Sequence, residues 1–312
     1  MTFKSLWHIA ATASKIIEED VITTTSSLEV DPLYSALSLG TELLVATGKV
    51  PQALHHKMNV PYMSGHFEFP IKYGYSLVGK TKNKELVHVM HPHQNKIHVS
   101  KEDCYYFSEK INPIVATQFS NLETVVNAIW TSNVQKNQKV LVCGTGSVGI
   151  LLAETLKKHI GANVFVKETN LVKQQKLQAL NFDLASDDDE FEICFNVSAS
   201  EHGLQFCINH TITEGKIIEL SWYGTQKVQL DLGGDFHYKR LQIVSSQVSD
   251  IPIKQKSNYT FFTRKKLVEQ LMLDIDYLPL ITNIVSFDEL PIFFDELRNN
   301  KPNNHFITIV KY

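Results

Sequence analysis

The sequence predicts an α/β chain in two parts, a β domain followed by a parallel sheet with crossover helices. Up to about residue 115, short apolar segments are punctuated by Gly, Pro and Asn and show little helical periodicity. From about residue 120 to about residue 250, apolar strand-like runs alternate with helix-like patterns. The chain has 312 residues, 43% of them hydrophobic, which suffices for two hydrophobic cores.

The first part contains four segments with strand character. They are rich in β-branched and aromatic residues and are separated by turn-forming residues: 27–37, 71–81, 85–91 and 95–100. We therefore expect a compact domain built mainly of short strands.

The second part alternates strands with helices. Strands are expected over residues 139–144, 162–168, 192–198, 216–222 and 240–247. Helices are expected over residues 147–160, 170–180 and 202–211. This alternation implies parallel strands joined by crossover helices. Two amphipathic helices, near residues 264–273 and 287–300, and a strand over residues 305–312 complete the chain.

Composition narrows the class of partner. Lys and Arg number 30 against 33 Asp and Glu, and no basic stripe with interleaved aromatic residues indicates a nucleic-acid-binding surface. No apolar run approaches the roughly 18 residues of a membrane span, and the first residues lack the pattern of a targeting signal. The four cysteines include no CxxC pair, which argues against a disulfide framework or a cysteine-rich zinc site. We expect a cytoplasmic protein with a small-molecule partner, and neither nucleic-acid nor membrane binding.

Three glycines lie where the strand at 139–144 gives way to a helix. Gly144, Gly146 and Gly149 fit the pattern GxGxxG. In that pattern the first glycine forms the turn, the second lets the backbone approach a pyrophosphate, and the third lets the helix pack on the strand. The alternative is a tight turn without a ligand. The flanking strand and helix favour a dinucleotide cradle, to which the intervening residues also belong: Thr145, Ser147 and Val148.

An acidic residue, Glu168, ends the second expected strand of this sheet. A carboxylate at this position can accept hydrogen bonds from both hydroxyls of the adenosine ribose, and it repels a 2′-phosphate. The sequence therefore predicts NAD as the cofactor, with NADP disfavoured.

Several longer motifs resemble, in the right order, those of the medium-chain dehydrogenase/reductase superfamily of alcohol dehydrogenase-like enzymes. "SALSLGTELLVATGKVP" resembles the first catalytic loop of the family, "FPIKYGYSLVG" its GHE segment, and "NLETVVNAIW" the helix that enters the cofactor domain. "SWYG", "LGGDFHYKRL" and "SSQV" resemble a compact subgroup that includes bacteriochlorophyllide dehydrogenases.

The resemblance covers nearly the whole chain. It implies a GroES-like β domain that carries catalytic residues, a Rossmann domain with a doubly wound parallel sheet, and a C-terminal segment that returns to the catalytic domain. Their expected ranges are residues 1–117, 118–252 and 253–312. It also implies a homo-oligomer, either a dimer or a tetramer.

The sequence departs from the zinc-dependent relatives at the metal site. The resemblance matches three zinc-ligand positions with Leu39, Tyr75 and Glu123, of which only Glu123 has a ligand-type side chain. A catalytic zinc needs three protein ligands and an open position, so zinc is not expected. The alternative is that His91 and His93, on a loop that borders the active site in the relatives, rebuild a metal site with Glu123.

Without zinc, a proton donor has to stabilise charge on the substrate oxygen. The resemblance implies that Thr41 hydrogen-bonds this oxygen, with the acidic Glu42 beside it. Tyr75 and His93 are candidate proton donors, and Glu123 could orient them. The alternatives are a packing threonine, a core tyrosine, a surface histidine and a buried carboxylate satisfied by backbone amides.

Further cofactor contacts are expected where strands of the sheet end, because such folds bind ligands there. Ser198, Tyr223 and Ser245 follow or end the expected strands in this region.

These features predict an NAD(H)-preferring oxidoreductase that acts on an alcohol or carbonyl group without zinc. Two alternatives remain open. One is reduction of a quinone or an activated C=C bond, and the other is a catalytically inactive dinucleotide-binding sensor. The presence of Thr41 and Glu123 argues against the sensor, which needs neither residue.

Overall fold

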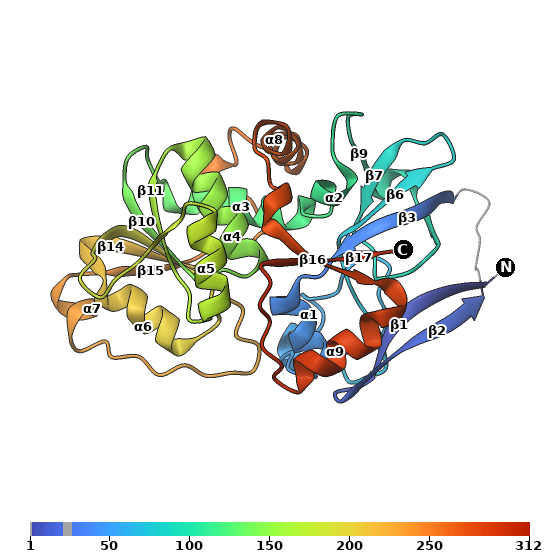
Figure 1. Ribbon diagram of the computed structural model, residues 1–312, viewed down its shortest axis with the longest axis horizontal. Coiled ribbons are helices and arrows are strands. Elements are labelled where there is room, and N and C mark those ends of the chain that lie inside the picture. The colour runs from blue at the N-terminus through green and yellow to red at the C-terminus, as the bar shows by residue number, and fades with distance from the viewer. Residues whose placement is uncertain (1, 21–26) are drawn as a thin grey trace. The chain divides into compact units, whose positions relative to one another are not determined.

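The structure is a computed structural model that describes residues 2–20 and 27–312 (Figure 1). The chain forms two compact units. The first contains the residues up to Ser120 together with Ile281–Asn303 and Ile307–Tyr312, and the second contains Asn121–Leu280 and Asn304–Phe306. This division differs from the expected ranges in one respect that matters for the site, because residues 253–280 belong to the second unit.

The second unit is built on a parallel sheet of six strands in the order β12-β11-β10-β13-β14-β15. Its strands are β10 (Lys139–Cys143), β11 (Asn163–Lys167), β12 (Asp183–Leu184), β13 (Phe191–Asn196), β14 (Thr211–Glu219) and β15 (Gln242–Ser245). Every neighbouring pair is parallel. The order reverses at β10, so the sheet is doubly wound, and the predicted Rossmann-type architecture is confirmed.

Helices connect strands of this sheet, as the alternating pattern predicted: α4 (Ser147–Thr155), α5 (Leu171–Ala179), α6 (Glu201–Asn209) and α7 (Asp235–Tyr238). Two more helices flank the sheet in the chain, α3 (Phe119–Ser132) before β10 and α8 (Phe261–Asp274) after β15. The helix α4 continues as a π-turn, η3 (Leu156–Ile160). Side-chain caps mark two helix starts, because Asn170 accepts hydrogen bonds from the first turn of α5 and Thr260 forms a capping box on α8.

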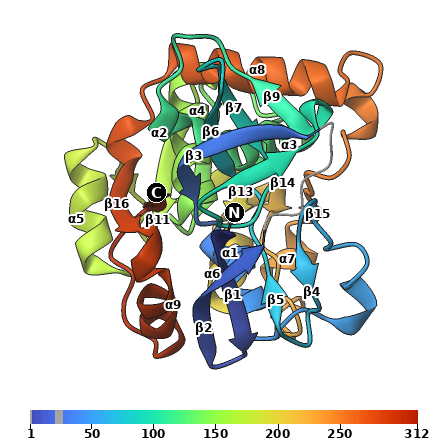
Figure 2. The ribbon, with the colours of Figure 1, turned by 90° about the vertical axis from the view of Figure 1, so that its right-hand side faces the viewer.

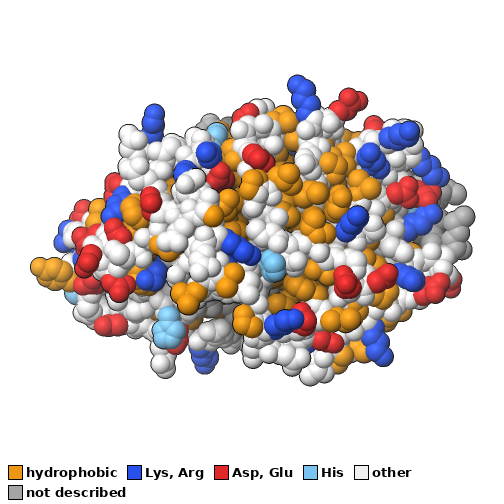
Figure 3. Space-filling view, in the orientation of Figure 1, with side chains coloured by type: hydrophobic (Ala, Val, Ile, Leu, Met, Phe, Trp, Pro, Cys, Tyr) orange, Lys and Arg blue, Asp and Glu red, His pale blue; other side chains and the backbone are white. Residues whose placement is uncertain are grey.

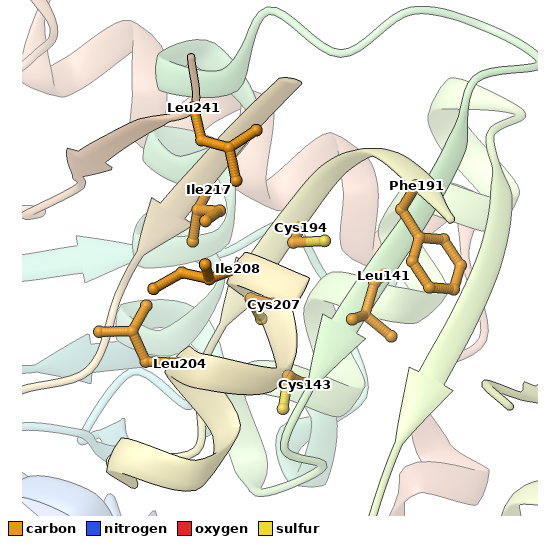
Figure 4. Close-up of a cluster of buried hydrophobic side chains, with 9 residues drawn as sticks. All are labelled: Leu141, Cys143, Phe191, Cys194, Leu204, Cys207, Ile208, Ile217 and Leu241. Carbon is orange, nitrogen blue, oxygen red and sulfur yellow. The ribbon is translucent and has the colours of Figure 1, made fainter. Parts of the chain in front are cut away.

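One core cluster of the second unit lies between the sheet and α6. Figure 4 shows nine buried side chains of this cluster, and they come mainly from β10, β13, β14 and α6. They are Leu141, Cys143, Phe191, Cys194, Leu204, Cys207, Ile208, Ile217 and Leu241. The cluster fixes the end of β10, and with it the position of the glycine-rich turn that follows.

The first unit consists mainly of antiparallel sheets, as expected for a GroES-like domain. One sheet has the order β2-β1-β5-β4, and the other runs β16-β17-β3-β6-β7-β9 with β8 paired to β3. The strands are β1 (Thr2–Ala10), β2 (Ala13–Asp20), β3 (Leu28–Ala36), β4 (Ser64–Gly65), β5 (Ile71–Lys72), β6 (Leu77–Thr81), β7 (Leu86–Val89), β8 (Ile97–Val99), β9 (Cys104–Tyr106), β16 (Ile281–Ser286) and β17 (Ile307–Lys311). Figure 2 shows the hairpin of β1 and β2 beside β5 and β4.

Among the described residues of the first unit, three helices accompany the sheets: α1 (Leu39–Ala46), α2 (Pro113–Ala116) and α9 (Leu290–Arg298). Short 3₁₀ turns lie at η1 (Gln52–Leu54), η2 (Lys101–Asp103), η4 (Ile253–Gln255), η5 (Leu278–Leu280) and η6 (Phe287–Glu289). The segment that resembles the first catalytic loop, residues 35–51, contains the helix α1. Glu42 stabilises its start, because the carboxylate accepts a hydrogen bond of 2.8 Å from the backbone N–H of Ser38 and lies in the first turn.

Hydrophobic side chains gather on the surface in the region of β16, β17 and α9 (Figure 3). Ile284 of β16 and Ile292 of α9 are the exposed large residues of these elements, at 52% and 64% exposure. Within residues 2–20 and 27–312, no helix combines the length and the apolar character needed to cross a membrane.

Candidate functional site

The glycine-rich turn of the second unit has the geometry of a ligand cradle. Gly144 has a φ of +97°, which L residues rarely adopt, and a Cβ on Gly149 would lie 2.0 Å from the carbonyl oxygen of Gly144. These two glycines are required by the fold itself. Gly146 is different, because a Cβ there would meet no atom within 4 Å. Packing therefore does not explain Gly146, and the space beside it is free for a ligand.

Gly146 is the N-cap of α4, so the cradle ends in a helix N-terminus. The backbone N–H groups of the first turn, which contains Ser147 and Val148, have no acceptor within the helix, and they carry the positive end of its dipole. Thr145 is buried at 1% exposure, and its hydroxyl donates a hydrogen bond to Glu168. The turn thus fits a pyrophosphate, and Thr145 links it to the next strand.

Glu168 lies directly after β11, and its carboxylate is held in place on both oxygens. Oε1 accepts hydrogen bonds from the backbone N–H groups of Thr169 and Asn170 at 2.8 and 2.9 Å. Oε2 accepts the hydroxyl of Thr145 and lies 3.9 Å from Nζ of Lys173. The carboxylate is therefore a fixed negative charge at the carboxyl edge of the sheet, where a ribose could exchange with Thr145.

A second polar cluster lies at the ends of β13 and β14. Glu219 Oε2 accepts hydrogen bonds from Asn196 Nδ2 at 2.7 Å and from the hydroxyl of Tyr223 at 3.2 Å. Ser198 donates to Asn196 Oδ1 at 2.7 Å. Burial and the charge of Glu219 raise the pKa of Tyr223, so its hydroxyl stays protonated. The structure brings Ser198 and Tyr223 into one network, whereas Ser245 ends β15 as an exposed residue outside it.

In the first unit, the start of α1 and the segment after β5 bring three hydroxyl groups together. The oxygen of Tyr75 lies near the side chains of Ser38 and Thr41, and both lower its pKa. Burial and the nearby charge of Glu42 outweigh them and raise the pKa of Tyr75 to about 12. Tyr75 therefore remains a hydrogen-bond donor at neutral pH, with the Thr41 hydroxyl beside it.

Glu42 and His93 form a buried pair beside these hydroxyl groups. His93 Nε2 lies 2.8 Å from Glu42 Oε2, and the side chains are exposed by only 1% and 2%. On its other face, His93 Nδ1 lies 2.8 Å from the hydroxyl of Ser35, which lies 2.9 Å from the hydroxyl of Tyr312. The interpretation of His93 as a surface histidine is wrong, because the fold encloses the loop that carries it.

His91, on the same loop, is also buried and has different neighbours. Its Nδ1 lies 2.9 Å from the carbonyl oxygen of Pro92, and its ring stacks on Tyr62 with a centroid distance of 5.0 Å. Burial lowers the pKa of His91 to about 4. The described residues contain no group of three or more His, Cys, Asp or Glu side chains arranged to hold a metal ion.

Glu123 belongs to the second unit and pairs with a residue that sequence reasoning did not connect to it. Arg264 of α8 donates from Nε and Nη2 to Glu123 Oε1 at 3.2 and 3.1 Å. The same guanidinium donates to Asn127 Oδ1 at 3.1 Å. Burial raises the pKa of Glu123, and the charge of Arg264 opposes this shift. The carboxylate is thus satisfied by an ion pair rather than by backbone amides.

Several polar residues of these networks were missed at the level of sequence, among them Ser35, Asn196, Glu219 and Tyr312. Asn196 and Glu219 could have been found, because each is a polar residue near the carboxyl end of an otherwise apolar strand. Ser35 and Tyr312 carried no such signal. Their meeting depends on the antiparallel pairing of β17 with β3, which are distant in sequence.

No protein-family model matches this sequence, and no curated protein matches it. Solved structures are similar over the whole chain. A protein described as a short chain alcohol dehydrogenase from Escherichia coli CFT073, in complex with NADH, has a TM-score of 0.77 at 13% identity, with 100% of this chain and 99% of that chain covered. The 2R,3R-butanediol dehydrogenase from Bacillus subtilis has a TM-score of 0.74 at 15% identity, with both chains covered completely.

The acetophenone reductase from Geotrichum candidum, in complex with NAD, has a TM-score of 0.73 at 13% identity, with 100% of this chain and 97% of that chain covered. At such low identities the likeness establishes the fold. The chain has the two-part fold of zinc-type medium-chain dehydrogenases, with a GroES-like unit and a Rossmann unit. The resemblance to a compact subgroup stays a prediction.

Proposed function

We propose that this chain is an NAD(H)-preferring oxidoreductase that interconverts an alcohol and a carbonyl group of a small molecule without catalytic zinc. The observation that carries the proposal is the cluster of Thr41 and Tyr75 hydroxyl groups at the positions that correspond to the metal region of the relatives. A chain with this fold that keeps a nucleotide cradle and adds paired hydroxyl donors has the parts needed for carbonyl chemistry.

The cofactor fits the second unit. The amides at the start of α4 would bind the pyrophosphate, because Gly146 leaves the space beside them free. Glu168 would accept the hydroxyls of the adenosine ribose and would repel a 2′-phosphate. Ser198 and Tyr223 are proposed for the other half of the cofactor, with Ser245 as a further contact at the edge strand.

Bound NADH supplies the hydride, and the protein must supply the proton and stabilise negative charge on the substrate oxygen. The hydroxyl of Thr41 is proposed to donate a hydrogen bond to that oxygen, and Tyr75 donates to or replenishes Thr41. His93 has its two ring nitrogens engaged by Glu42 and Ser35, so we assign it to the support of this pair rather than to direct proton donation.

Zinc does not fit the residues present. Leu39 offers no ligand atom, and the ring nitrogens of His93 are both committed to hydrogen bonds inside the first unit. His91 keeps one nitrogen on the carbonyl oxygen of Pro92. A catalytic zinc needs three protein ligands, and this set does not supply them. Glu123 remains a candidate for a role in catalysis, although its ion pair with Arg264 gives it a structural task.

The test combines binding and turnover. Gly146→Val should fold as the wild type does, because the structure has free space there, yet its side chain would occupy the volume proposed for the pyrophosphate. We expect native circular dichroism and loss of NADH binding by fluorescence titration. Gly149→Ala is the matched control, because its Cβ would collide with Gly144 and should destabilise the turn itself.

Turnover of NADH is then measured against a panel of aldehydes, ketones, quinones and enones. Reduction of a carbonyl that falls by roughly 10²-fold or more in Thr41→Val supports the proposal. Preferential reduction of quinones or enones would replace it with the C=C or quinone reductase. NADH binding without turnover of any compound would favour the sensor, and normal NADH binding by Gly146→Val would overturn the cradle.

A further inference from the structure

A continuous chain of hydrogen bonds, buried from Ser35 to Glu42 and half-buried at Tyr312, connects Tyr312 to Glu42 inside the first unit. The hydroxyl of Tyr312 lies 2.9 Å from that of Ser35, Ser35 lies 2.8 Å from His93 Nδ1, and His93 Nε2 lies 2.8 Å from Glu42 Oε2. Ser35 and His93 are both 0% exposed, and Glu42 is 1% exposed. Water therefore does not reach the links between them.

The hydrogen atoms of this chain can be ordered in one direction from donor chemistry alone. The backbone of Gln94 lies near the oxygen of Tyr312 and lowers the pKa of the tyrosine, as a donor does. Tyr312 can then donate its own proton to Ser35, and Ser35 can donate to Nδ1 of His93. This leaves Nδ1 as an acceptor, so the proton of a neutral imidazole is on Nε2 and points to Glu42.

The opposite direction lacks a final acceptor. If Nδ1 carried a proton, it would donate to Ser35, Ser35 would donate to Tyr312, and Tyr312 would need a further acceptor. In the described part of the chain, Ser35 is the group hydrogen-bonded to this hydroxyl, and the nearby backbone of Gln94 lowers its pKa as a donor does, so neither offers the acceptor that is needed. A buried hydroxyl without an acceptor is costly, so the first direction is favoured.

The neighbouring histidines carry no charge at neutral pH. His8 and His91 both interact electrostatically with His93. Burial lowers the pKa of His8 to about 3 and that of His91 to about 4, so both are neutral at physiological pH. Both oxygens of Glu42 face donors, Oε1 the N–H of Ser38 at 2.8 Å and Oε2 the Nε2 of His93 at 2.8 Å, so the carboxylate acts as an acceptor on both sides.

We propose that Ser35 and Tyr312 are positioning residues that hold His93 as the neutral Nε2–H tautomer, so that Glu42 stays an ionised acceptor beside Thr41 and Tyr75. The catalytic consequence rests on the proposed function. An ionised Glu42 next to Tyr75 keeps the tyrosine protonated, and Tyr75 and Thr41 then remain donors toward a substrate oxygen. The tautomer itself does not depend on any activity.

The direct test is nitrogen NMR on the full chain labelled with ¹⁵N-histidine, without cofactor, at neutral pH. The His93 signals are assigned by their loss in His93→Gln. We expect a protonated Nε2 and an unprotonated Nδ1 in the wild type. A protonated Nδ1, either as the other tautomer or as an imidazolium, would overturn the proposal.

Tyr312→Phe tests the contribution of the distal hydroxyl. The variant keeps the ring that stacks on Phe287 at 5.1 Å and removes only the donor to Ser35. Ser35 is then free to turn and accept from Nδ1, so the imidazolium fraction of His93 should rise about fivefold, which corresponds to about 1 kcal/mol, the net contribution of one hydrogen bond. Unchanged signals in Tyr312→Phe would remove Tyr312 from the role.

Tyr34→Phe is the matched control, because Tyr34 lies on β3 beside Ser35 and its hydroxyl has no hydrogen-bond partner among the residues that the structure describes. Its His93 signals should match the wild type. If a carbonyl substrate is found, Tyr312→Phe should lower kcat and leave the KM for NADH unchanged, because the nucleotide cradle is in the second unit. Absence of turnover would count against the proposed function and would leave the NMR result standing.

Discussion

Three glutamates show how the partners of one residue decide its role. Glu168 is held by backbone amides and Thr145 at the sheet edge, Glu123 is neutralised by Arg264, and Glu42 is bonded to His93 and the N–H of Ser38. From motif positions, the sequence predicted a catalytic role for Glu123 and a cofactor-binding role for Glu168. Only their partners distinguish a ligand-facing carboxylate from one that stabilises the fold.

Glu168 should make the protein prefer NADH over NADPH by at least about tenfold in Kd, or about 1.4 kcal/mol. The reason is repulsion between a fixed carboxylate and the 2′-phosphate, reduced in part by Lys173 at 3.9 Å. Fluorescence titration of both cofactors gives the two constants. Glu168→Ala should abolish the preference, whereas Asp187→Ala, which removes an exposed charge, should keep it. Equal constants in the wild type would refute the assignment.

The buried histidines predict a loss of stability in mild acid. The pKa of His8 is lowered from 6.5 to about 3, and that of His91 to about 4, mainly by burial. The unfolded chain therefore binds protons that the folded chain excludes. Stability is complete above pH 6.5 and falls as the pH drops below it, by about 1.4 kcal/mol per pH unit and histidine at most.

Urea unfolding at several pH values between about 7 and about 4.5 tests this, because most carboxylates remain ionised in that window. His8→Asn should reduce the slope of unfolding free energy against pH. His98→Asn is the control, because His98 is only partly buried and should leave the slope unchanged. A wild-type free energy that does not change over this window would show that both histidines are accessible to protons in the folded state.

At the level of elements, α1 and α8 differ most from the sequence expectation. The segment of α1 resembles a loop, yet Glu42 caps its start from within the first turn. The segment of α8 was expected with the first domain. Its Arg264 instead binds Glu123 and Asn127 of α3, which ties α8 to the second unit.

Breaking the ion pair between α3 and α8 should destabilise the second unit. Arg264→Met leaves Glu123 charged, buried and unpaired, so the unfolding free energy should fall by about 3 kcal/mol. The double variant with Glu123→Gln should recover part of this loss, because it removes the unpaired charge. Circular dichroism during urea unfolding measures both.

Lys266→Met is the control on the same helix. Its ion pair with Glu269 involves a half-exposed ammonium group, so its loss should cost less than about 1 kcal/mol. Equal losses for Arg264→Met and Lys266→Met would contradict the importance of the buried pair. If Glu123→Gln lowers stability but not turnover per folded molecule, the catalytic candidacy of Glu123 is wrong.

At the scale of the whole molecule, the fold is that of zinc-type dehydrogenases, while the resemblance matches two of the three zinc-ligand positions with Leu39 and Tyr75, whose side chains are unsuited to the metal. We expect purified protein to carry far less than one zinc ion per chain by elemental analysis, and any activity to survive chelation. Stoichiometric zinc that is lost together with activity in His91→Ala or His93→Ala would show that the histidine loop forms a metal site. The homo-oligomer also stays a prediction.

The sequence by itself determined the layered pattern of the second unit and the place of its cradle. Strand and helix periods, a glycine at φ +97° and an acidic residue after β11 are local features, and local steric and hydrogen-bonding preferences suffice to predict them. The antiparallel strands of the first unit were also predicted in type, because their turns and alternation are local. The helix α1 was not predicted, because its start depends on a hydrogen bond from the N–H of Ser38 to the carboxylate of Glu42 in a segment that contains a glycine.

Only the tertiary structure decided which polar groups meet. His93 is a buried partner of Glu42 rather than a surface residue, because the loop that carries it is bonded to β1 through the N–H of Leu6 at 3.0 Å. Tyr312 reaches Ser35 because β17 pairs with β3, and Arg264 reaches Glu123 because α8 packs in the second unit. Each of these contacts joins residues far apart in the chain. Inside the fold, where water is excluded, a hydrogen bond between such polar groups is electrostatically stronger than it is in water. No local sequence pattern encodes which distant groups meet there.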